Sequence, residues 1–489
     1  MRLNALLQSA GLPEILANPE IRSLSYDSRR AGEGSLFFAL PGTKTNGAEF
    51  VQQAVGHGSA AVVTEADPGA CACPVIRVPN ARAAMADIAA TFYGHPDRSM
   101  KCVGVTGTNG KTTTAFLLKH LLDSASLRCG LLGTVKYVVG AEEIPAPRTT
   151  PEATDLQELL SRMRDSGSRA VAMEVSSHAL VQHRARGIAF DAAVFTNLTQ
   201  DHLDYHQSMD AYFAAKTLLF EGLASQTEKK GKAVVNVDDR YGHLLVGKLG
   251  KRTLKTLTFG RGLGVDFRAS AIRFDGNGSV FQLEAKKKSF LVRTPLIGLF
   301  NIYNVLGALA AATVCGVELR GAIAALASAP QVPGRLERVP GKRNFHVFVD
   351  YAHTDDALKN VLRTLKDLKP ARLLTVFGCG GDRDRAKRPL MAAAAEEFSD
   401  WTILTSDNPR REDPEAILAD VAVGLRRTNF EKITDREEAI RQAIHLAEPG
   451  DIVLIAGKGH ENYQEFSDRR IPFDDVEVAE RAMAYKKTL

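Results

Sequence analysis

A glycine-rich segment at residues 106–113, TGTNGKTT, is the part of the sequence whose residue types point most directly to chemistry. It lies between an apolar run, KCVGVT, and a helix-like run, TTTAFLLKHLL. Backbone N–H groups of such a loop, together with the N-terminus of the following helix, bind phosphate. Lys111 would neutralise the β- and γ-phosphates, and the Thr112 hydroxyl would bind Mg²⁺. The spacing is shorter than G-x-x-x-x-G-K-[ST], so a plain glycine-rich turn is the alternative, but the strand–loop–helix context favours nucleotide binding.

Two more polar segments follow apolar, strand-like runs. Glu174 lies in MEVSSH (residues 173–178), and TNLTQDHLDYH covers residues 196–206. Ligands of open α/β sheets bind at the carboxyl ends of the strands, so Glu174 could hold Mg²⁺ beside the first loop. The histidines and aspartates of the second segment could also bind a metal. The alternatives are a strand-end glutamate with a helix-capping serine and an ordinary polar loop.

Lys216 lies on the apolar face of a predicted helix, DAYFAAKTLLF. Tyr212, Phe213, Leu219 and Phe220 stand three or four positions away from it, which is the spacing of one helix face. A lysine that extends its ammonium group to solvent is the ordinary explanation. The chemical explanation is a lysine of lowered pKa that reacts with carbon dioxide.

Three charged or glycine-rich turns end strand-like runs in the last third of the chain. They are DYAH (350–353), DNPR (407–410) and GKGHE (457–461). Each could be an ordinary turn between a strand and a helix. Together, at the carboxyl ends of strands in one small domain, they predict a shared ligand-binding cleft.

Composition limits the classes of protein to which this chain can belong. It has 489 residues, which corresponds to roughly three domains. The formal net charge of +5 is too dilute for a nucleic-acid binder, and the 45% hydrophobic and 24% charged residues exclude disorder. The six cysteines form no C-x-x-C pair, and the apolar run at 305–317 is shorter than the ~20 residues of a membrane span. With no signal-peptide pattern at the N-terminus, we expect a cytoplasmic protein that binds neither nucleic acid nor membrane.

Hydrophobic periodicity predicts an α/β fold in three domains. Residues 1–98 mix short strands and turns, and they predict a small α/β N-terminal domain. Residues 99–331 alternate strands and helices, which is typical of a doubly wound, mostly parallel sheet, with a more β-like addition at 267–295. Residues 332–489 repeat the alternation and predict a C-terminal Rossmann-like domain.

Taken in order, these segments resemble the Mur ligases, the ATP-dependent amino-acid ligases of peptidoglycan synthesis. The resemblance covers nearly the whole chain and rests on TGTNGKTT, EVSSH, TNLTQDHLDYH, the Lys216 helix, FNIYN (300–304), PGRLE (333–337), DYAH, GCGGDRD (378–384) and GKGHE. It implies three domains, which bind a UDP substrate, ATP and an amino acid in that order, and a monomeric enzyme. Asp355 departs from the family pattern, in which proline is common at this position, but it removes no ligand.

The resemblance also implies a role for each matching residue. ATP would be bound by Gly107, Thr108, Asn109, Gly110, Lys111, Thr112, Thr113, Asn301, Asn304, Arg335 and Asp350. One Mg²⁺ would be bound by Thr112 and Glu174, and a second by His202 and a carbamylated Lys216 (N6-carboxylysine). With Lys111, the residues Glu174, His202 and Lys216 would form the catalytic set. The substrate UDP-MurNAc-L-Ala-D-Glu would be bound by Tyr26, Ser28, Thr43, Lys44, Thr45, Thr149, Thr150, Ser176, Gln182 and Arg184.

The DNPR turn implies which amino acid is added. It resembles the signature of family members that add meso-diaminopimelate, whose distal carboxylate matches a bidentate arginine such as Arg410. Lysine lacks that carboxylate and would leave the arginine unpaired. The pocket for meso-diaminopimelate would contain Arg383, Asp407, Asn408, Pro409, Arg410, Gly457 and Glu461.

Three other functions share some of these sequence features. Folylpolyglutamate synthase shares the phosphate-binding loop and a modified lysine, but the N-terminal ~98 residues and the DNPR turn argue against it. A Mur ligase that adds a different residue lacks this pairing of DNPR with GKGHE. A nucleotide-dependent switch would hydrolyse ATP slowly without any amino acid and would leave the second predicted metal site unused.

Overall fold

The structure is a computed structural model that describes residues 1–42, 45–251, 254–341 and 343–486. Thr43 and Lys44, which were expected to bind the UDP substrate, lie outside the described residues. The chain divides into two compact units. Unit 1 comprises Met1–Ser270, Leu283–Phe290 and Tyr303–Ala325, and unit 2 comprises Ala271–Gln282, Leu291–Ile302 and Leu326–Leu489.

Unit 1 begins with a parallel sheet of order β1-β2-β3-β4. Its elements are α1 (Leu3–Ser9), β1 (Ser23–Ser25), η1 (Ser28–Arg30), β2 (Ser35–Ala39), η2 (Gly47–Phe50), α2 (Val51–Gly56), β3 (Ala61–Thr64), β4 (Val75–Arg77), α3 (Ala81–Phe92) and η3 (Pro96–Ser99). Buried side chains such as Phe38 and Val63 form one cluster with Leu6 of α1 and Met85 of α3. These elements form the small α/β arrangement that the sequence predicts at the N-terminus, and the boundary at residue 98 stays a prediction.

The main sheet follows, with the strand order β15-β14-β13-β12-β11-β10-β5-β9-β6-β7-β8. Its strands are β5 (Lys101–Thr106), β6 (Cys129–Leu132), β7 (Lys136–Val139), β8 (Glu142–Pro145), β9 (Ala170–Glu174), β10 (Ala192–Phe195), β11 (Lys232–Asn236), β12 (Thr256–Gly260), β13 (Phe267–Asp275), β14 (Gly278–Ala285) and β15 (Lys288–Thr294). The accompanying helices are α4 (Lys111–Ser124), α5 (Ala153–Asp165), α6 (Ser177–Val181), α7 (Leu203–His206), α8 (Met209–Ser225), α9 (Arg240–Gly250), α10 (Leu299–Val314) and α11 (Leu319–Leu326).

The register of the central strands gathers three of the predicted motifs at one edge. β5 pairs in parallel with both β9 and β10. Val105 lies opposite Glu174, and Thr106 lies opposite Phe195. The loop after β5, the segment after Glu174 and the segment after Phe195 therefore leave the sheet side by side, as expected for ligand-binding segments of a parallel sheet.

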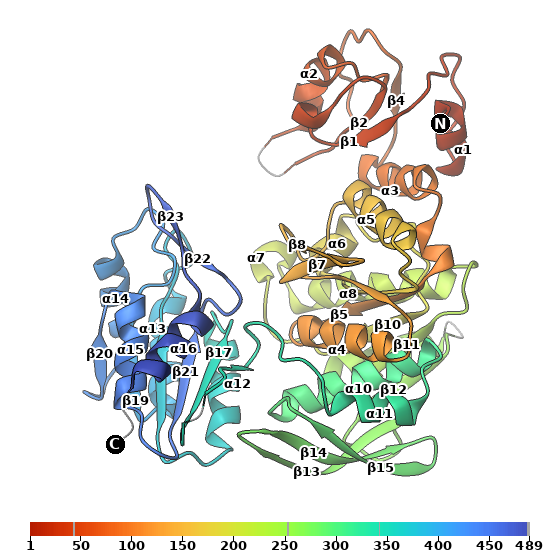
Figure 1. Ribbon diagram of the computed structural model, residues 1–489. Helices are drawn as coiled ribbons and strands as arrows, with labels where there is room; N and C mark the ends of the chain where they lie inside the picture. Colours follow the sequence, from red (N-terminus) through yellow and green to blue (C-terminus); the bar gives the residue numbers. More distant parts are fainter. Residues whose placement is uncertain (43–44, 252–253, 342, 487–489) are drawn as a thin grey trace. The chain divides into compact units, whose positions relative to one another are not determined.

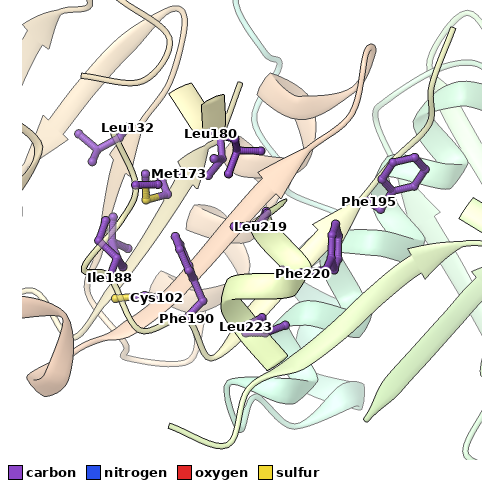
Figure 2. Packing of buried hydrophobic residues seen from close by; sticks show 14 of the residues in the cluster. Cys102, Leu132, Met173, Leu180, Ile188, Phe190, Phe195, Leu219, Phe220 and Leu223 are labelled. Atoms are coloured by element: carbon purple, nitrogen blue, oxygen red, sulfur yellow. The ribbon is translucent and has the colours of Figure 1, made fainter. Parts of the chain in front are cut away.

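A large apolar cluster fixes α8, and with it Lys216, against this sheet. Leu219, Phe220 and Leu223 of α8 are buried together with Phe190 and Phe195 (Figure 2). The rings of Phe195 and Phe220 pack edge to face, with centroids 6.3 Å apart. A fully buried aromatic side chain contributes about 1.5–3 kcal/mol, so this face holds the helix in place.

Unit 2 contains a six-stranded sheet of order β16-β17-β21-β18-β19-β20 (Figure 1, green to blue). Its strands are β16 (Glu337–Arg338), β17 (His346–Asp350), β18 (Leu373–Phe377), β19 (Trp401–Leu404), β20 (Phe430–Lys432), β21 (Ile452–Ala456), and the separate pair β22 (Tyr463–Glu465) and β23 (Arg470–Pro472). Its helices are α12 (Asp355–Lys366), α13 (Lys387–Phe398), α14 (Pro414–Ala422), α15 (Arg436–Leu446) and α16 (Asp475–Tyr485).

The alternation along β18 shows that this sheet is covered on both faces. Leu373 and Phe377 belong to a cluster with α12, α13 and α14, whereas Leu374 and Val376 belong to another with α15 and α16. All strand pairs of this sheet are parallel except β16 with β17. The α/β fold with two doubly wound sheets is thus confirmed. In the described part of the chain, no helix is long and apolar enough to cross a membrane.

Candidate functional site

The loop between β5 and α4 has a backbone that only glycine fits at two positions. Gly107 has φ +148°, and a Cβ there would lie 1.9 Å from Thr196 Oγ1. Gly110 is the N-cap of α4 with φ +83°, and its Cβ would lie 2.2 Å from Asn304 Oδ1. Neighbouring polar groups thus occupy the space that a side chain would need, so both positions require glycine.

The segment after β10 supports the loop from one side. Thr196 Oγ1 donates to Asn109 O at 2.6 Å, and Asn109 N donates to Asn197 Oδ1 at 2.9 Å. Thr108 N donates to Asn197 O at 2.9 Å, and Thr199 N donates to Thr108 Oγ1 at 3.1 Å. These bonds fix the loop in one conformation, with α4 and its N-terminal N–H groups directly behind it.

Two lysines meet on one carbonyl of this loop. Lys111 Nζ donates to Gly107 O at 2.9 Å and to Thr108 O at 2.7 Å. Lys216 Nζ also donates to Gly107 O, at 2.7 Å, although it lies 109 positions away in sequence. The structure thus brings the two predicted catalytic lysines together at the phosphate-binding loop.

Lys216 is almost fully buried, with 1% exposure, and forms no ion pair with a carboxylate in the described chain. Its Nζ lies 4.5 Å from the centre of the Tyr212 ring. Burial, and next the charge of Lys111, hold the pKa of its ammonium well below the ordinary value. An amine in such a place is neutral at a lower pH than usual, which makes it a nucleophile for carbon dioxide. The ordinary explanation, a lysine that reaches solvent, is therefore wrong.

His202 stands at the start of α7 with a left-handed backbone, φ +53°. Its ring lies 5.0 Å from that of His178, and its Nε2 is 3.4 Å from Asp201 Oδ2. Burial lowers the pKa of His202, so its imidazole is neutral and able to bind a metal. His206 instead makes a 2.9 Å hydrogen bond with Ser177 Oγ. The positive φ of His202, a residue other than glycine, is a form of backbone strain, and strain of this kind clusters at functional sites.

Glu174 connects the predicted metal site to the predicted substrate site through Thr134. Thr134 N donates to Glu174 Oε1 at 2.8 Å, and Thr134 Oγ1 donates to Glu174 Oε2 at 3.1 Å. The same Thr134 hydroxyl lies 3.0 Å from Thr149 Oγ1. The carboxylate of Glu174 is 1% exposed and is therefore held in one orientation.

The donor set fits Mg²⁺ better than a transition metal. Within the described residues, no group of three or more His, Cys, Asp and Glu side chains is arranged to hold a metal ion. Mg²⁺ needs no such cage, because it is bound by one or two carboxylates together with substrate phosphates and water. The buried hydroxyl of Thr112 and the carboxylate of Glu174 are oxygen donors of this kind.

Further residues predicted for the UDP substrate form a hydrogen-bonded group near Glu174. Thr150 Oγ1 donates to Glu174 O at 2.9 Å, and Ser176 N donates to Thr150 Oγ1 at 3.2 Å. Arg184 Nη1 donates to Thr150 O at 3.0 Å, and Arg184 Nη2 donates to Gln182 Oε1 at 2.7 Å. The structure thus places four of these predicted residues in direct contact.

The predicted substrate residues of the first domain lie in a separate group. Tyr26 OH donates to Asp155 Oδ2 of α5 at 2.5 Å, and Ser28 Oγ donates to Gln53 Oε1 at 2.8 Å. Thr45 O accepts from Gly42 N at 3.1 Å. Among the described members of this group, Tyr26 is therefore the one that is bonded to α5.

In unit 2, the carboxyl ends of the strands gather the other predicted residues. Asp350 lies opposite Ala456, and Phe377 lies opposite both Ala456 and Leu404. The DYAH, GCGGDRD, DNPR and GKGHE segments therefore leave the sheet along one edge. Asn301, on α10, also belongs to this unit and donates to Ile297 O at 2.8 Å.

Asp350 is buried, and its carboxylate accepts a backbone hydrogen bond from the PGRLE segment. Its Oδ2 accepts from Leu336 N at 2.6 Å, and its Oδ1 accepts from Ala352 N at 2.8 Å. Burial raises the pKa of this carboxyl, and the charge of Arg335 opposes the increase. The Arg335 guanidinium lies over the Tyr351 ring at 4.9 Å.

Arg410 is held in a defined position by three contacts. Its backbone has φ +51° and its N donates to Glu465 O at 3.0 Å. Its Nε donates to Glu465 Oε2 at 3.1 Å, and its Nη1 donates to Gly381 O at 2.8 Å. Arg383 belongs to the same corner, because a Cβ on Gly380 would meet both arginine side chains. The corner therefore brings the Arg410 guanidinium near the aliphatic part of the Arg383 side chain.

Asn408 and Glu461 form a second hydrogen-bonded group at this edge of the sheet. Asn408 Nδ2 donates to Glu461 Oε2 at 2.8 Å, and Lys458 Nζ donates to Asn408 Oδ1 at 3.0 Å. Gly457 approaches Asp407 so closely that its Cβ would lie 2.7 Å from Asp407 Oδ2. The predicted residues of the DNPR and GKGHE segments are thus neighbours.

Sequence reasoning missed several residues that position this chemistry. Thr134, Asn197, Glu465 and Lys458 each hold a predicted site residue in place. Lys458 and Asn197 stood inside motifs already singled out and could have been found there. Thr134 and Glu465 carry no such signal, because their contacts depend on how distant strands meet.

The chain matches known family models along most of its length. Three family models match successive parts of the chain: "Mur ligase family, catalytic domain" at residues 20–93, "Mur ligase middle domain" at 105–312 and "Mur ligase, glutamate ligase domain" at 334–459. Together they span most of the chain in the order that the motifs predict.

Individual relatives are similar over nearly the full length. A UDP-N-acetylmuramoyl-L-alanyl-D-glutamate--2,6-diaminopimelate ligase of Solibacter usitatus (strain Ellin6076) is 46% identical over 490 residues, 99% of this chain and 98% of the relative. A solved structure of a ligase with the same name is 36% identical, with TM-score 0.74 and 99% of both chains covered. The MurF ligase from Thermotoga maritima in complex with ADP has TM-score 0.63 at 19% identity over 95% of this chain and 97% of that one, which shows the fold alone. The chain therefore belongs to the Mur ligase family.

Proposed function

We propose that this chain is an ATP-dependent ligase that joins meso-diaminopimelate to the γ-carboxylate of D-Glu in UDP-MurNAc-L-Ala-D-Glu, a step of peptidoglycan precursor synthesis. The observation that carries the proposal is the pair of sites in one chain. Unit 1 has a phosphate-binding loop against the buried Lys216, and unit 2 has Arg410 beside Asn408 and Glu461. The names of the 46% and 36% identical relatives support the same reaction.

The first chemical step joins two anions, so charge neutralisation is the main task of unit 1. The γ-carboxylate of the substrate attacks the γ-phosphate of ATP, and an acyl phosphate and ADP result. The N–H groups at residues 107–113 bind the phosphates, and Lys111 turns from the carbonyls of Gly107 and Thr108 toward them. Mg²⁺, when bound, neutralises phosphate charge.

Thr112 and Glu174 would hold one Mg²⁺, and His202 with a carbamylated Lys216 would hold a second. Carbamylation converts the Lys216 amine into an anionic oxygen ligand, which removes the cost of burying an ammonium group beside Lys111. The absence of a carboxylate partner for Lys216 in the described chain supports this role.

The acceptor substrate, UDP-MurNAc-L-Ala-D-Glu, would bind beside the residues that hold Mg²⁺. Thr150 is bonded to the backbone of Glu174 and to Ser176 and Arg184, and Thr149 reaches the Glu174 carboxylate through Thr134, which suits a γ-carboxylate that must reach ATP. Tyr26, Ser28 and residues 43–45 would bind the UDP part of the substrate.

The second step is attack of the diaminopimelate amine on the acyl phosphate, with release of phosphate. Arg410 would bind the distal carboxylate of diaminopimelate with two parallel hydrogen bonds, and Arg383 would add positive charge. Asn408 and Glu461 would bind the distal ammonium group. Lysine lacks that carboxylate and would form neither of these two hydrogen bonds, which disfavours it.

The proposal includes a monomeric enzyme of the cytoplasm with domains at 1–98, 99–331 and 332–489. Its test is product analysis by mass spectrometry after incubation with ATP, Mg²⁺, UDP-MurNAc-L-Ala-D-Glu and diaminopimelate. A product heavier by one diaminopimelate residue is expected. ADP formed without that product would favour a nucleotide-dependent switch, and product formed only with a folate substrate would favour folylpolyglutamate synthase.

A further inference from the structure

Glu152 is a buried carboxylate that neither caps its helix nor belongs to any motif. It occupies the N-cap position of α5, where an acidic side chain usually accepts a hydrogen bond from the helix backbone. Its side chain makes no such bond, and the residue is only 4% exposed. Helix capping therefore does not explain why a carboxylate is buried here.

Three arginines from three segments converge on this carboxylate. Arg184 Nη2 lies 2.9 Å from Glu152 Oε1, and Arg148 Nη1 lies 3.4 Å from the same oxygen. Arg82 Nη1 lies 3.1 Å from Glu152 Oε2. Arg184 and Arg82 are well shielded, with side-chain exposures of 9% and 19%.

Each of two arginines also contacts a segment proposed to bind the UDP substrate. Arg184 donates to Thr150 O and to Gln182 Oε1. Arg82, on α3, donates through Nη2 to Pro41 O at 3.4 Å, just before residues 43–45. Helices α3 and α5 lie side by side in unit 1 (Figure 1).

The group formed by Glu152 and its three arginines has a net positive charge. One carboxylate balances one of the three guanidinium groups, so two positive charges remain; Arg184 and Arg82 are shielded, whereas the Arg148 side chain is 51% exposed. Without the carboxylate, the three cations would repel one another and separate. Glu152 thus holds together a cationic group that suits a substrate with a diphosphate and two carboxylates.

We propose that Glu152 is a positioning residue for the UDP-peptide substrate, which aligns Arg184 beside Thr150 and ties Arg82 to the Pro41 segment. The proposal rests on the proposed function for the identity of that substrate. The ion pairs of Glu152 in the described chain reach none of the residues proposed to bind ATP or diaminopimelate, so we expect its effect to be confined to the binding of one of the three substrates.

The test is steady-state kinetics of Glu152→Gln, which keeps the size of the side chain and removes its charge. We expect the KM for UDP-MurNAc-L-Ala-D-Glu to rise by at least about tenfold, with kcat and the KM values for ATP and diaminopimelate within about twofold of the original. Glu158→Gln is the matched control, because Glu158 lies on the same helix without a salt bridge in the described chain and should leave every parameter unchanged. An unchanged KM for the UDP substrate in Glu152→Gln overturns the proposal, as does an equal rise for all three substrates.

A double-mutant cycle with a second variant keeps the proposal testable if Glu152→Gln fails to fold. Arg82→Gln removes one partner while two arginines remain on Glu152, and it should raise the same KM alone. If Glu152 acts through Arg82, the double variant raises KM by less than the product of the two single effects. A double variant whose KM rises by the full product of the two single effects would contradict coupling through Arg82. Failure of the original chain to use diaminopimelate would reject the proposed function instead, and product analysis separates that result from the Glu152 result.

Discussion

Arg410→Ala tests most sharply how the added amino acid is selected. In the structure the Arg410 guanidinium is held from two sides, by Glu465 Oε2 at 3.1 Å and by Gly381 O at 2.8 Å. Its side chain is 20% exposed, so it is partly shielded from water. A carboxylate bound by such a pre-positioned guanidinium would receive two charge-assisted hydrogen bonds.

The size of the expected effect follows from those two bonds. At about 1.5 kcal/mol each, their loss weakens binding of the diaminopimelate transition state by about 3 kcal/mol. This corresponds to a decrease of about a hundredfold in kcat/KM for diaminopimelate. Because L-lysine has no distal carboxylate, its kcat/KM should change little, and the preference between the two amino acids should nearly vanish.

The assay is ADP release at varied diaminopimelate or L-lysine, with the other two substrates saturating. Arg411→Ala is the matched control, since Arg411 is the next residue, is 81% exposed and pairs only with Asp382 among the described residues. It should keep the original kcat/KM. A kcat/KM for diaminopimelate within about threefold of the original in Arg410→Ala would refute the reasoning, as would an equal loss with both amino acids.

Other predictions concern the loop, the buried lysine and pH. Lys216→Ala should abolish turnover, and native mass spectrometry should find one carbon dioxide more on the original chain but not on the variant; near-normal turnover would reject the carbamate role. Gly107→Ala places a Cβ 1.9 Å from Thr196 Oγ1, so ATP affinity measured by calorimetry should fall by at least about tenfold. Gly247→Ala, where the Cβ meets no atom within 4 Å, should leave it unchanged. Burial chiefly lowers the pKa of His460 to about 4, so the folded protein keeps it neutral while the unfolded chain gains a proton below about pH 6.5. Stability contributed by the neutral ring is then lost as pH falls, and urea unfolding of His460→Gln should lose about 1–2 kcal/mol less than the original between pH 7 and pH 5. An identical pH dependence of unfolding in the original chain and in His460→Gln would contradict the lowered pKa of His460.

The sheet edges were predictable because they depend on local patterns. An apolar run followed by a polar turn identifies the carboxyl end of a buried strand, and this placed Glu174 and the phosphate-binding loop correctly at one edge. The helical spacing likewise placed Lys216 correctly on the apolar face of its helix, although it left open whether the ammonium reaches solvent. Both inferences used only residues within a few positions of each other.

Contacts between distant segments could not be predicted from the sequence. Nothing near Lys216 indicates that its ammonium reaches Gly107 O, because that contact depends on how α8 packs over the sheet. The support of the loop by Asn197 and of Arg410 by Glu465 has the same origin. The left-handed backbone of Arg410 was also unpredictable, since arginine has no local preference for it. The boundaries at residues 98 and 331 stay a prediction.

The central claim is that ATP cleavage is coupled to the addition of diaminopimelate. Its most direct test is phosphate release from ATP in the presence of UDP-MurNAc-L-Ala-D-Glu, compared with meso-diaminopimelate, with L-lysine and without an amino acid. We predict release that depends on meso-diaminopimelate. Equal release with L-lysine would contradict the role of Arg410 in selection, and release indifferent to all three conditions would contradict the ligase reaction itself.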